Sequence, residues 1–428
     1  MSDDLYTKGY PHIPFPRGPH SVSAADLCTN GGDSALLRLF YPTPITAGQK
    51  GPRLMDPKKW TSWYLGDRYC EGFVQFITNS AYSQFILPAL KPFLYFFGYY
   101  ITKDIKIPVE WCKELLRRKG PPPPAGGEKG LQDDGRAWRV AGLVVVSHGM
   151  ANHRSSLSTL SSDLASHGFV VVAIEHREGS ASASFFMDPK TKEKEWVSYT
   201  AYRHDGQLET RINEITTAYS VLRRLNEGDV TNLLEKESPF PIETFKGALD
   251  LSNAVLLGHS YGGVSTLKVL AGPRNSFKCG VVLDPWMYPV KGTTAELGEA
   301  IKVPILSIST EDFNKGPNLK ALQVFQENHQ NAKSSFLTMM GTCHHHGNDA
   351  PWISGKFMWW VTGGKSSHHP KTIHRFQRSL ILTFIDKHID TKRDNFYSSH
   401  AWLTRCRNAI EEDRHIIVSH GDVNVNGG

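Results

Sequence analysis

VLLGHSYGG, residues 255–263, joins a short apolar run to a G-x-S-x-G pattern, and an amphipathic segment follows over residues 264–270. The apolar run predicts a buried strand and the amphipathic segment a helix, so the pattern would lie on the sharp turn between them. Such a turn exposes the hydroxyl of Ser260, a weak nucleophile that needs a neighbouring base to take its proton. Gly258 and Gly262 leave room for backbones to pass closely at the turn. The stretch therefore predicts a nucleophilic serine between a strand and a helix.

Strands and helices are predicted to alternate around this turn. We expect strands over residues 140–146, 169–175, 254–257, 279–283, 303–308 and 335–339, and helices over 155–167, 208–225 and 373–388. Apolar strands that alternate with helices are typical of a largely parallel sheet covered on both faces. The predicted fold class is therefore α/β, and the G-x-S-x-G turn within it indicates the α/β-hydrolase fold, with a mostly parallel central sheet.

One catalytic core with additions at both ends is expected in the 428 residues. We divide the chain into a loop-rich entry (1–54), an aromatic helical segment with a Pro/Gly-rich insertion in the same domain (55–137), the catalytic α/β-hydrolase core (138–390) and a C-terminal tail (391–428). The entry carries one early strand, over 35–41. The insertion begins with the run GPPPPAGG at Gly120. Little regular structure is expected in the tail after about Asn408.

Composition narrows the function classes. An apolar share of 40% and a charged share of 21% exclude a disordered or fibrous chain. The net charge of +6 is mild and the basic residues are scattered, so nucleic-acid binding is not expected. The six cysteines lie far apart without C-x-x-C spacing, which argues against a zinc site or a disulfide framework. The first residues are polar and lack the apolar region of a secretory signal, so we expect a cytoplasmic protein.

Two aromatic stretches are candidates for contact with lipid. Residues 85–101 read FILPALKPFLYFFGYYI, which is shorter than the ~20 residues of a spanning helix. A core helix pair, a lid and a patch at the bilayer interface remain alternatives for it. A second stretch, 352–360, could join such a patch. The lipid-facing candidates are Phe93, Phe96, Phe97, Trp352, Trp359 and Trp360, with burial in the core as the alternative for the aromatic residues.

The nucleophile needs a histidine base downstream, because the catalytic residues of this fold follow the chain order Ser, Asp/Glu, His. The candidates among the downstream histidines are His329, His344, His345, His346, His368, His369, His374 and His388. The trio at 344–346 directly follows a predicted strand, where the base belongs, whereas His374 and His388 lie on the predicted terminal helix. Neighbouring histidines seldom converge on one ion, so no metal site is expected.

The orienting acid and the oxyanion donors also have candidates. Asp284 ends the strand after the elbow helix, and Glu311 and Asp312 follow the next strand. Both positions belong to the carboxyl edge of the sheet, so the residues alone leave the acid open. The oxyanion of acyl transfer needs two backbone N–H donors, one from Tyr261 after the nucleophile and one from the loop after an earlier strand, where Met150 is the natural candidate.

Several ordered blocks of the chain resemble a known family. They are SHGMANHR (147–154), DLASHGFVVVAIEHREGSAS (163–182), GHSYGG (258–263), VVLDPWMYPV (281–290), GTCHHHGND (341–349) and FIDKHID (384–390). Over roughly residues 35–390 the chain is similar to the platelet-activating factor acetylhydrolases, in particular the intracellular type II branch and its plasma relative. The resemblance implies a calcium-independent phospholipase of the α/β-hydrolase fold. It also implies Asp284 as the acid, His344 as the base, and Met150 and Tyr261 as oxyanion donors.

The expected activity is hydrolysis of the sn-2 acetyl, or short or oxidised acyl, ester of platelet-activating factor and related phospholipids, through an acyl-enzyme on Ser260. No cofactor and no metal are required. The expected partner is the phospholipid substrate, with peripheral membrane contact and no nucleic acid. A general carboxylesterase or lipase of the same fold is the first alternative, and a non-catalytic binding protein with a hydrolase fold is the second.

Overall fold

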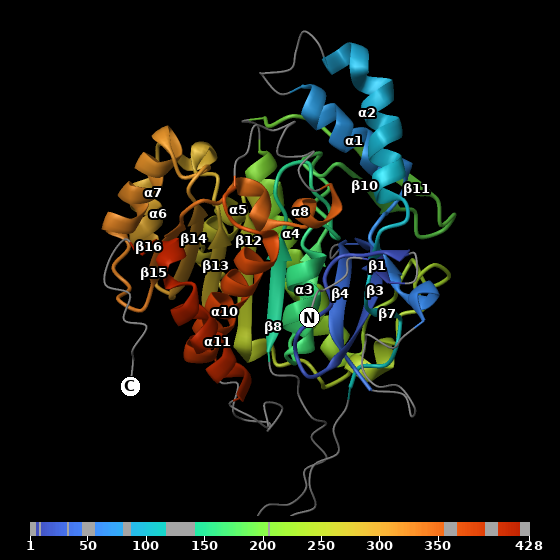
Figure 1. Ribbon diagram of the computed structural model, residues 1–428. Coiled ribbons are helices and arrows are strands. Elements are labelled where there is room, and N and C mark those ends of the chain that lie inside the picture. The colour runs from blue at the N-terminus through green and yellow to red at the C-terminus, as the bar shows by residue number, and fades with distance from the viewer. Residues whose placement is uncertain are drawn as a thin grey trace, which may run out of the picture.

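A ten-stranded sheet organises the molecule in the computed structural model (Figure 1). The structure describes residues 6–7, 10–31, 34–44, 56–79, 87–116, 142–203, 206–354, 366–389 and 401–419. The strand order in the sheet is β16-β15-β14-β13-β12-β8-β9-β4-β3-β7. These strands span β3 (Ser21–Cys28), β4 (Leu36–Thr43), β7 (Glu110–Trp111), β8 (Leu143–Ser147), β9 (Val170–Ile174), β12 (Ala254–His259), β13 (Cys279–Leu283), β14 (Ile305–Thr310), β15 (Ser335–Met339) and β16 (Ile417–Ser419).

The central strands of the sheet are parallel and antiparallel strands flank them, while the short edge strand β7 pairs with β3 in parallel. Strands β9, β8, β12, β13, β14 and β15 pair in parallel, whereas β4 joins β9, β3 joins β4 and β16 joins β15 in antiparallel fashion. The predicted α/β class with a mostly parallel sheet is confirmed. Short two-stranded sheets are formed by β1 (Tyr6–Thr7) with β2 (Tyr10–Pro11), β5 (Thr61–Ser62) with β6 (Lys106–Ile107), and β10 (Ala183–Met187) with β11 (Lys194–Ser198).

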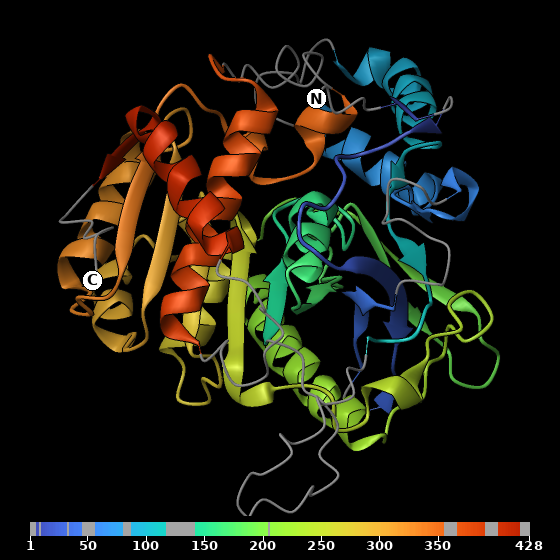
Figure 2. The same ribbon diagram turned by 60° about the horizontal axis from the view of Figure 1, so that its bottom comes forward.

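Helices cover both faces of the sheet, as Figure 2 shows from a second side. The α-helices within the described residues are α1 (Asp67–Thr78), α2 (Leu87–Thr102), α3 (Ser158–Ser166), α4 (Gln207–Glu227), α5 (Tyr261–Ala271), α6 (Thr294–Ala300), α7 (Gly316–Asn328), α8 (Ala350–Ile353), α10 (Pro370–His388) and α11 (Ala401–Glu412). Alternate strand residues face opposite sides. Val145 and Leu256 belong to the core cluster that includes residues of α4, α5 and α7, whereas Val146 and Leu257 belong to the cluster that includes residues of α3, α10 and α11. Burial on both sides explains why these strands are apolar runs.

The C-terminal tail is more regular than expected, so the prediction of little structure after Asn408 is wrong for residues up to 419. Helix α11 lies along α10 (Figure 1), and β16 adds an antiparallel edge to β15. The reason is an amphipathic pattern, since Cys406 and Ile410 of α11 are buried in the core on that side. Ile416, just before β16, is buried in the same core. The sequence interpretation also missed β3, a fully buried strand in the N-terminal entry.

Helices α1 and α2 form a hairpin beyond the end of the central strands where α5 and α8 begin (Figure 1). Within the described residues, no helix is long and apolar enough to cross a lipid bilayer. The Pro/Gly-rich insertion that begins at Gly120 lies outside the described residues. The hairpin formed by α1 and α2 lies over the edge of the sheet at which the predicted catalytic residues meet.

Candidate active site

Ser260 lies on the turn between β12 and α5, in a conformation that side-chain-bearing residues rarely adopt. Its φ is 57° and its ψ is −116°, a strained combination of the kind that persists at functional sites when surrounding structure enforces it. The turn is held by the Ser260 amide, which donates to the carbonyl of Leu283 at 2.9 Å. A Cβ on Gly262 would lie only 2.0 Å from the carbonyl oxygen of Ser147, so only glycine fits there. The predicted strand–turn–helix arrangement is present.

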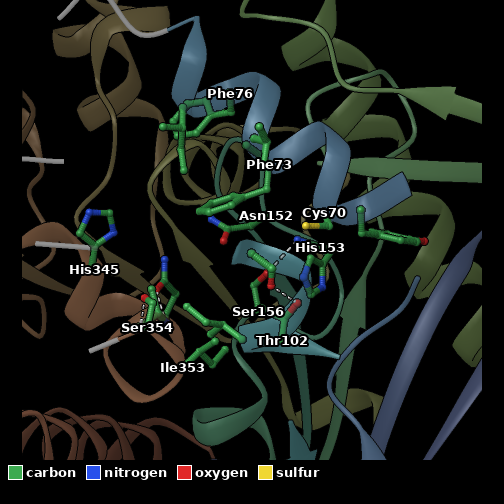
Figure 3. A pocket seen from close by; sticks show the side chains of 18 of the residues that line it. Cys70, Phe73, Phe76, Thr102, Asn152, His153, Ser156, His345, Ile353 and Ser354 are labelled. Carbon is green, nitrogen blue, oxygen red and sulfur yellow. Dashed lines mark hydrogen bonds between the residues drawn. The ribbon is translucent and has the colours of Figure 1, made fainter. Parts of the chain in front are cut away.

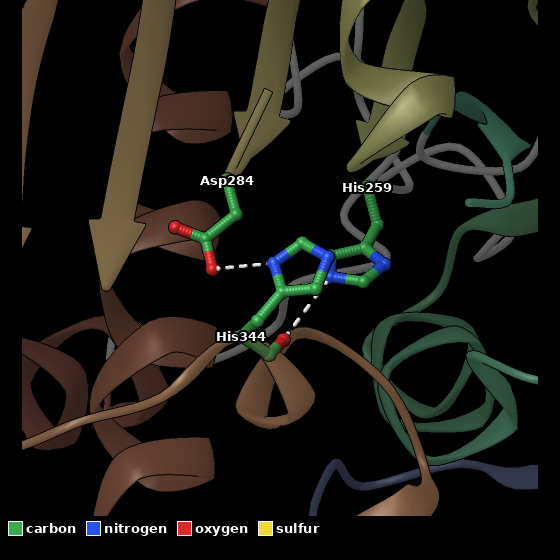
Figure 4. A group of neighbouring side chains, drawn as sticks. All are labelled: His259, Asp284 and His344. Carbon is green, nitrogen blue, oxygen red and sulfur yellow. Dashed lines mark hydrogen bonds and ion pairs between the residues drawn. The ribbon is translucent and has the colours of Figure 1, made fainter. Parts of the chain in front are cut away.

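A chain of hydrogen bonds joins Ser260, His344 and Asp284. The Ser260 hydroxyl lies 3.0 Å from Nε2 of His344, and Nδ1 of His344 lies 3.0 Å from Oδ2 of Asp284 (Figure 4 shows the histidine and the aspartate). His344 opens the short helical turn His344–Gly347 after β15, and Asp284 directly follows β13 with a φ of 46°. With Nδ1 protonated, Nε2 is free to accept the serine proton, which is the geometry of a nucleophile, base and orienting acid.

Asp284 is buried and receives two further hydrogen bonds from β14. The Thr310 amide donates to Oδ1 at 2.5 Å, and the Thr310 hydroxyl donates to Oδ2 at 2.7 Å. The competing acids are engaged elsewhere, because Glu311 accepts from the Gly341 amide at 2.7 Å and Asp312 pairs with an exposed lysine. The geometry therefore favours Asp284 over both alternatives.

Of the candidate histidines, His344 is the one placed against Ser260 within the described residues. The others have different partners: His369 caps the start of α10, His374 contacts Asp163, and His329 lies near Ser334. His346 contacts the amide of Cys343 within the same turn. These contacts favour structural roles for these four histidines.

His259 is a neighbour of the base that the sequence interpretation did not single out. Its ring stacks on His344 with centroids 4.6 Å apart, and its Nε2 lies 3.2 Å from the His344 carbonyl oxygen. Phe313 stacks on the His344 ring at 3.9 Å. Burial, helped by the nearby His344, holds the pKa of His259 well below its usual range, so this ring stays neutral. The sequence feature that could have identified His259 is its position directly before Ser260 in the elbow.

The two predicted oxyanion donors lie on segments that meet at Ser260. Tyr261 is the first residue of α5, where an amide has no carbonyl within the helix to bond. A Cβ on Gly149 would lie 3.0 Å from the Cβ of Ser260, which shows how closely the loop before Met150 passes the serine. In the described part of the chain we find no hydrogen-bond partner for the Met150 amide. Both amides are therefore available to a substrate oxygen.

Ser260 and His344 line a largely apolar cavity. Figure 3 shows other residues of its lining from close by. Helices α1 and α2 supply much of its apolar lining: Phe73, Val74, Phe76, Ile77, Leu94, Phe97 and Ile101. Polar groups are gathered near the serine, where Asn152, His153 and Ser156 contribute to the wall. The cavity suits a ligand with a hydrocarbon chain and one ester group, because few polar groups meet an otherwise apolar wall.

The lipid-facing candidates fall into three groups. Phe93 and Phe96 project from α2 with 61% and 58% of their surface exposed. Phe97 lines the cavity instead, and Trp352 packs partly buried against the core beside α10, which favours the core alternative for it. Trp359 and Trp360 lie outside the described residues.

Among the described residues, two groups offer His, Asp or Glu ligand atoms close enough to share an ion. One is His259, Asp284 and His344, whose Asp284–His344 pair belongs to the hydrogen-bonded chain above. The other is His176, Glu178 and Glu214. There Glu178 pairs with Arg211 at 2.9 Å, and Glu214 accepts from the Arg177 amide at 2.9 Å, so the carboxylates already have donors.

Comparisons with known proteins identify relatives of this chain. A family model described as "Platelet-activating factor acetylhydrolase, isoform II" matches residues 136–402. The platelet-activating factor acetylhydrolase of Cavia porcellus is 28% identical over 89% of this chain and 79% of its own length, and that of Gallus gallus is 28% identical over 90% and 86%. A putative phospholipase A2 of Schizosaccharomyces pombe is 26% identical over 60% of this chain and 70% of its own length.

A solved structure shares the fold at low sequence identity. The ferulic acid esterase of Streptomyces cinnamoneus aligns over 88% of this chain and 93% of its own, with a TM-score of 0.53 and 16% identity. At that identity the likeness concerns the fold alone, and it agrees with the predicted α/β-hydrolase architecture.

Proposed function

Because the chain belongs to the platelet-activating factor acetylhydrolase isoform II family, we propose that it hydrolyses the sn-2 acetyl ester of platelet-activating factor, and short or oxidised sn-2 esters of related phospholipids. The observation that carries the proposal is the hydrogen-bonded chain from Ser260 through His344 to Asp284 at the floor of an apolar cavity. A fold alone would not support an activity, whereas these side chains form a site with defined chemistry.

The proposed reaction begins when Ser260 attacks the ester carbonyl while Nε2 of His344 takes the serine proton. Asp284 holds His344 in the tautomer that leaves Nε2 unprotonated and then stabilises the imidazolium. The amides of Met150 and Tyr261 bind the oxygen that becomes negative, a contact worth about 3–4 kcal/mol for one donor. His344 then protonates the departing lysophospholipid, and a water molecule hydrolyses the acyl-enzyme with His344 again as base.

The proposal includes a way to reach substrate in a lipid surface. Phe93 and Phe96 are exposed on α2, and the inner side of the same helix lines the cavity through Leu94 and Phe97. A helix with aromatic rings outward at a lipid interface would place the cavity entrance near the substrate. We therefore propose a cytoplasmic protein with reversible membrane contact, and co-sedimentation with phosphatidylcholine vesicles tests that contact.

Release of acetate from sn-2-acetyl phosphocholine in the presence of EDTA tests the proposed activity. We expect calcium-independent turnover that Ser260→Ala abolishes and that Ser307→Ala keeps, since Ser307 is a buried β14 hydroxyl outside the cavity lining. Turnover of p-nitrophenyl acetate without turnover of the lipid would favour a general carboxylesterase. Turnover of neither would favour a non-catalytic binding protein.

A further inference from the structure

Arg211 of α4 is a fully buried arginine that the mechanism above does not use. Its side chain is 0% exposed, and its guanidinium donates four hydrogen bonds to other groups of the protein. Nη1 donates to the His148 carbonyl at 2.7 Å, Nε and Nη2 donate to the Ser180 hydroxyl at 2.9 and 2.6 Å, and Nε donates to Glu178 at 2.9 Å. Burying a guanidinium carries a large desolvation penalty unless such partners compensate it. The partners therefore indicate what this arginine holds in place.

Two of these partners hold the loop after β8 that carries Met150, which we call the oxyanion loop. His148 lies two residues before Met150, so a bond to its carbonyl fixes the peptide planes that lead to the Met150 amide. Ser180 accepts two guanidinium hydrogen bonds at its hydroxyl. Its carbonyl oxygen accepts a further hydrogen bond, from the Ala151 amide at 2.7 Å. Arg211 thus acts on the loop from both sides of Met150, directly on one side and through Ser180 on the other.

The guanidinium also touches the segment that carries the second donor. Its central carbon lies 4.4 Å from the centroid of the buried Tyr261 ring, within the range of a cation–π contact. The Tyr261 amide is the other predicted oxyanion donor. One side chain therefore contacts both segments whose amides must point at the same oxygen atom.

A neighbouring side-chain network supports the end of β8 but does not replace Arg211. Nε2 of His176 lies 2.8 Å from the Ser147 hydroxyl, and Nδ1 of the same ring lies 2.7 Å from Glu214. Ser147 and His176 of this second Ser–His–carboxylate chain are buried and Glu214 is partly buried. None of the three lines the cavity, so an ester bound there does not contact them. It supports the strand before the loop, whereas Arg211 contacts the loop itself.

We infer that Arg211 is a positioning residue that sets the separation and direction of the Met150 and Tyr261 amides. The inference rests on the proposed function, because it takes these two amides as the oxyanion donors. Arg211 does not line the cavity, so it acts through the loop and the Tyr261 ring rather than on the substrate. Its loss should lower binding of the oxyanion and leave binding of the uncharged ester unchanged.

Arg211→Lys tests this inference, because lysine keeps the charge but cannot form the planar fork that joins His148 and Ser180. With p-nitrophenyl acetate we expect kcat to fall about 10- to 100-fold with little change in KM, as for a sub-ångström misplacement of a catalytic group. The affinity for an alkyl trifluoromethyl ketone, which Ser260 converts to a tetrahedral oxyanion, should fall by the same factor. The affinity for a non-cleavable ether analogue of the lipid should not change.

Arg378→Lys is the matched control, because Arg378 is a largely buried arginine of α10 paired with Asp163 at 2.8 Å and lies outside the cavity lining. It should lower the melting temperature without changing kcat. If Arg211→Lys does not fold, Ser180→Ala removes the shared hydroxyl and should give the same kinetic pattern to a smaller degree. An unchanged kcat, or an equal loss of ether-analogue affinity, would overturn the inference. Turnover of p-nitrophenyl acetate keeps this test valid even if the phospholipid is not the substrate.

Discussion

Replacing Asp284 by asparagine removes the charge and one acceptor oxygen of the carboxylate while keeping the size of the side chain. In the native chain three donors meet this carboxylate: the Thr310 amide, the Thr310 hydroxyl and His344 Nδ1. Asparagine offers a single acceptor oxygen, and an amide nitrogen turned toward the Thr310 amide would leave two buried donors facing each other, at about 1–3 kcal/mol. The nitrogen is therefore expected at the Oδ2 position, where the threonine hydroxyl can rotate and accept from it.

That orientation changes the tautomer of His344. A nitrogen facing Nδ1 requires Nδ1 to accept a hydrogen bond, so the ring proton moves to Nε2, which can then no longer take the proton of Ser260. Triads that lose their carboxylate in this way lose about 10⁴ in kcat, or about 5.4 kcal/mol in the barrier. KM should change little, because Asp284 does not line the cavity.

The assay is steady-state hydrolysis of sn-2-acetyl phosphocholine, with Asp312→Asn as the matched control. Asp312 is the competing acid of the sequence, and its pair with Lys315 is exposed on both sides, so its replacement should leave kcat within about twofold, as for surface ion pairs. The reasoning fails if Asp284→Asn keeps more than a tenth of the native kcat, or if Asp312→Asn loses as much as Asp284→Asn.

Three further changes test other parts of the account. Gly149→Ala would place a methyl group 3.0 Å from the Cβ of Ser260 and should lower kcat about 10²-fold by displacing the oxyanion loop, whereas Gly292→Ala, with nothing within 4 Å, should not. Burial, with the charges of nearby arginines, holds the pKa of His153 well below its usual range. The unfolded chain therefore binds a proton at this histidine below about pH 6.5 while the folded chain does not, and the free energy of unfolding falls as the pH falls below that value. In urea melts below about pH 6.5, His153→Gln should reduce the slope of this free energy against pH by about 1.4 kcal/mol per pH unit, and equal slopes for the two proteins would contradict this. Phe96→Asp should weaken vesicle binding tenfold or more, since burying one phenylalanine is worth about 1.5–3 kcal/mol, without lowering p-nitrophenyl acetate turnover; unchanged vesicle binding would count against the α2 contact.

Local patterns were enough to predict the elbow and the central strands. The apolar run before Ser260 became β12, and the predicted strand over 279–283 coincides with β13. The acid could not be assigned from the residues alone, because Asp284 and Asp312 both follow strands of a parallel sheet. Only the folded structure distinguishes the two acids, because Thr310 and His344 form hydrogen bonds with Asp284.

Other features depend on tertiary contacts that short stretches do not reveal. Strand β3 is buried throughout because the core covers both of its faces, with Ala25 and Leu27 on one side and Val22 and Ala24 on the other. Its small and polar residues gave no clear alternation. Helix α11 gains its stability from packing on α10, so its short amphipathic pattern looked like an ordinary tail. Arg211 lies far from the elbow in sequence, and nothing near it indicates that its guanidinium reaches the oxyanion loop.

The acyl-enzyme is the species that tests the central claim most directly. When the protein is mixed with sn-2-acetyl phosphocholine and quenched in acid during the first turnovers, peptide mass mapping should find one acetyl group on Ser260. The same experiment with His344→Gln should find none, because the serine proton has no acceptor. Release of acetate without acetylation of Ser260, or an acetyl group on a different side chain, would contradict the account.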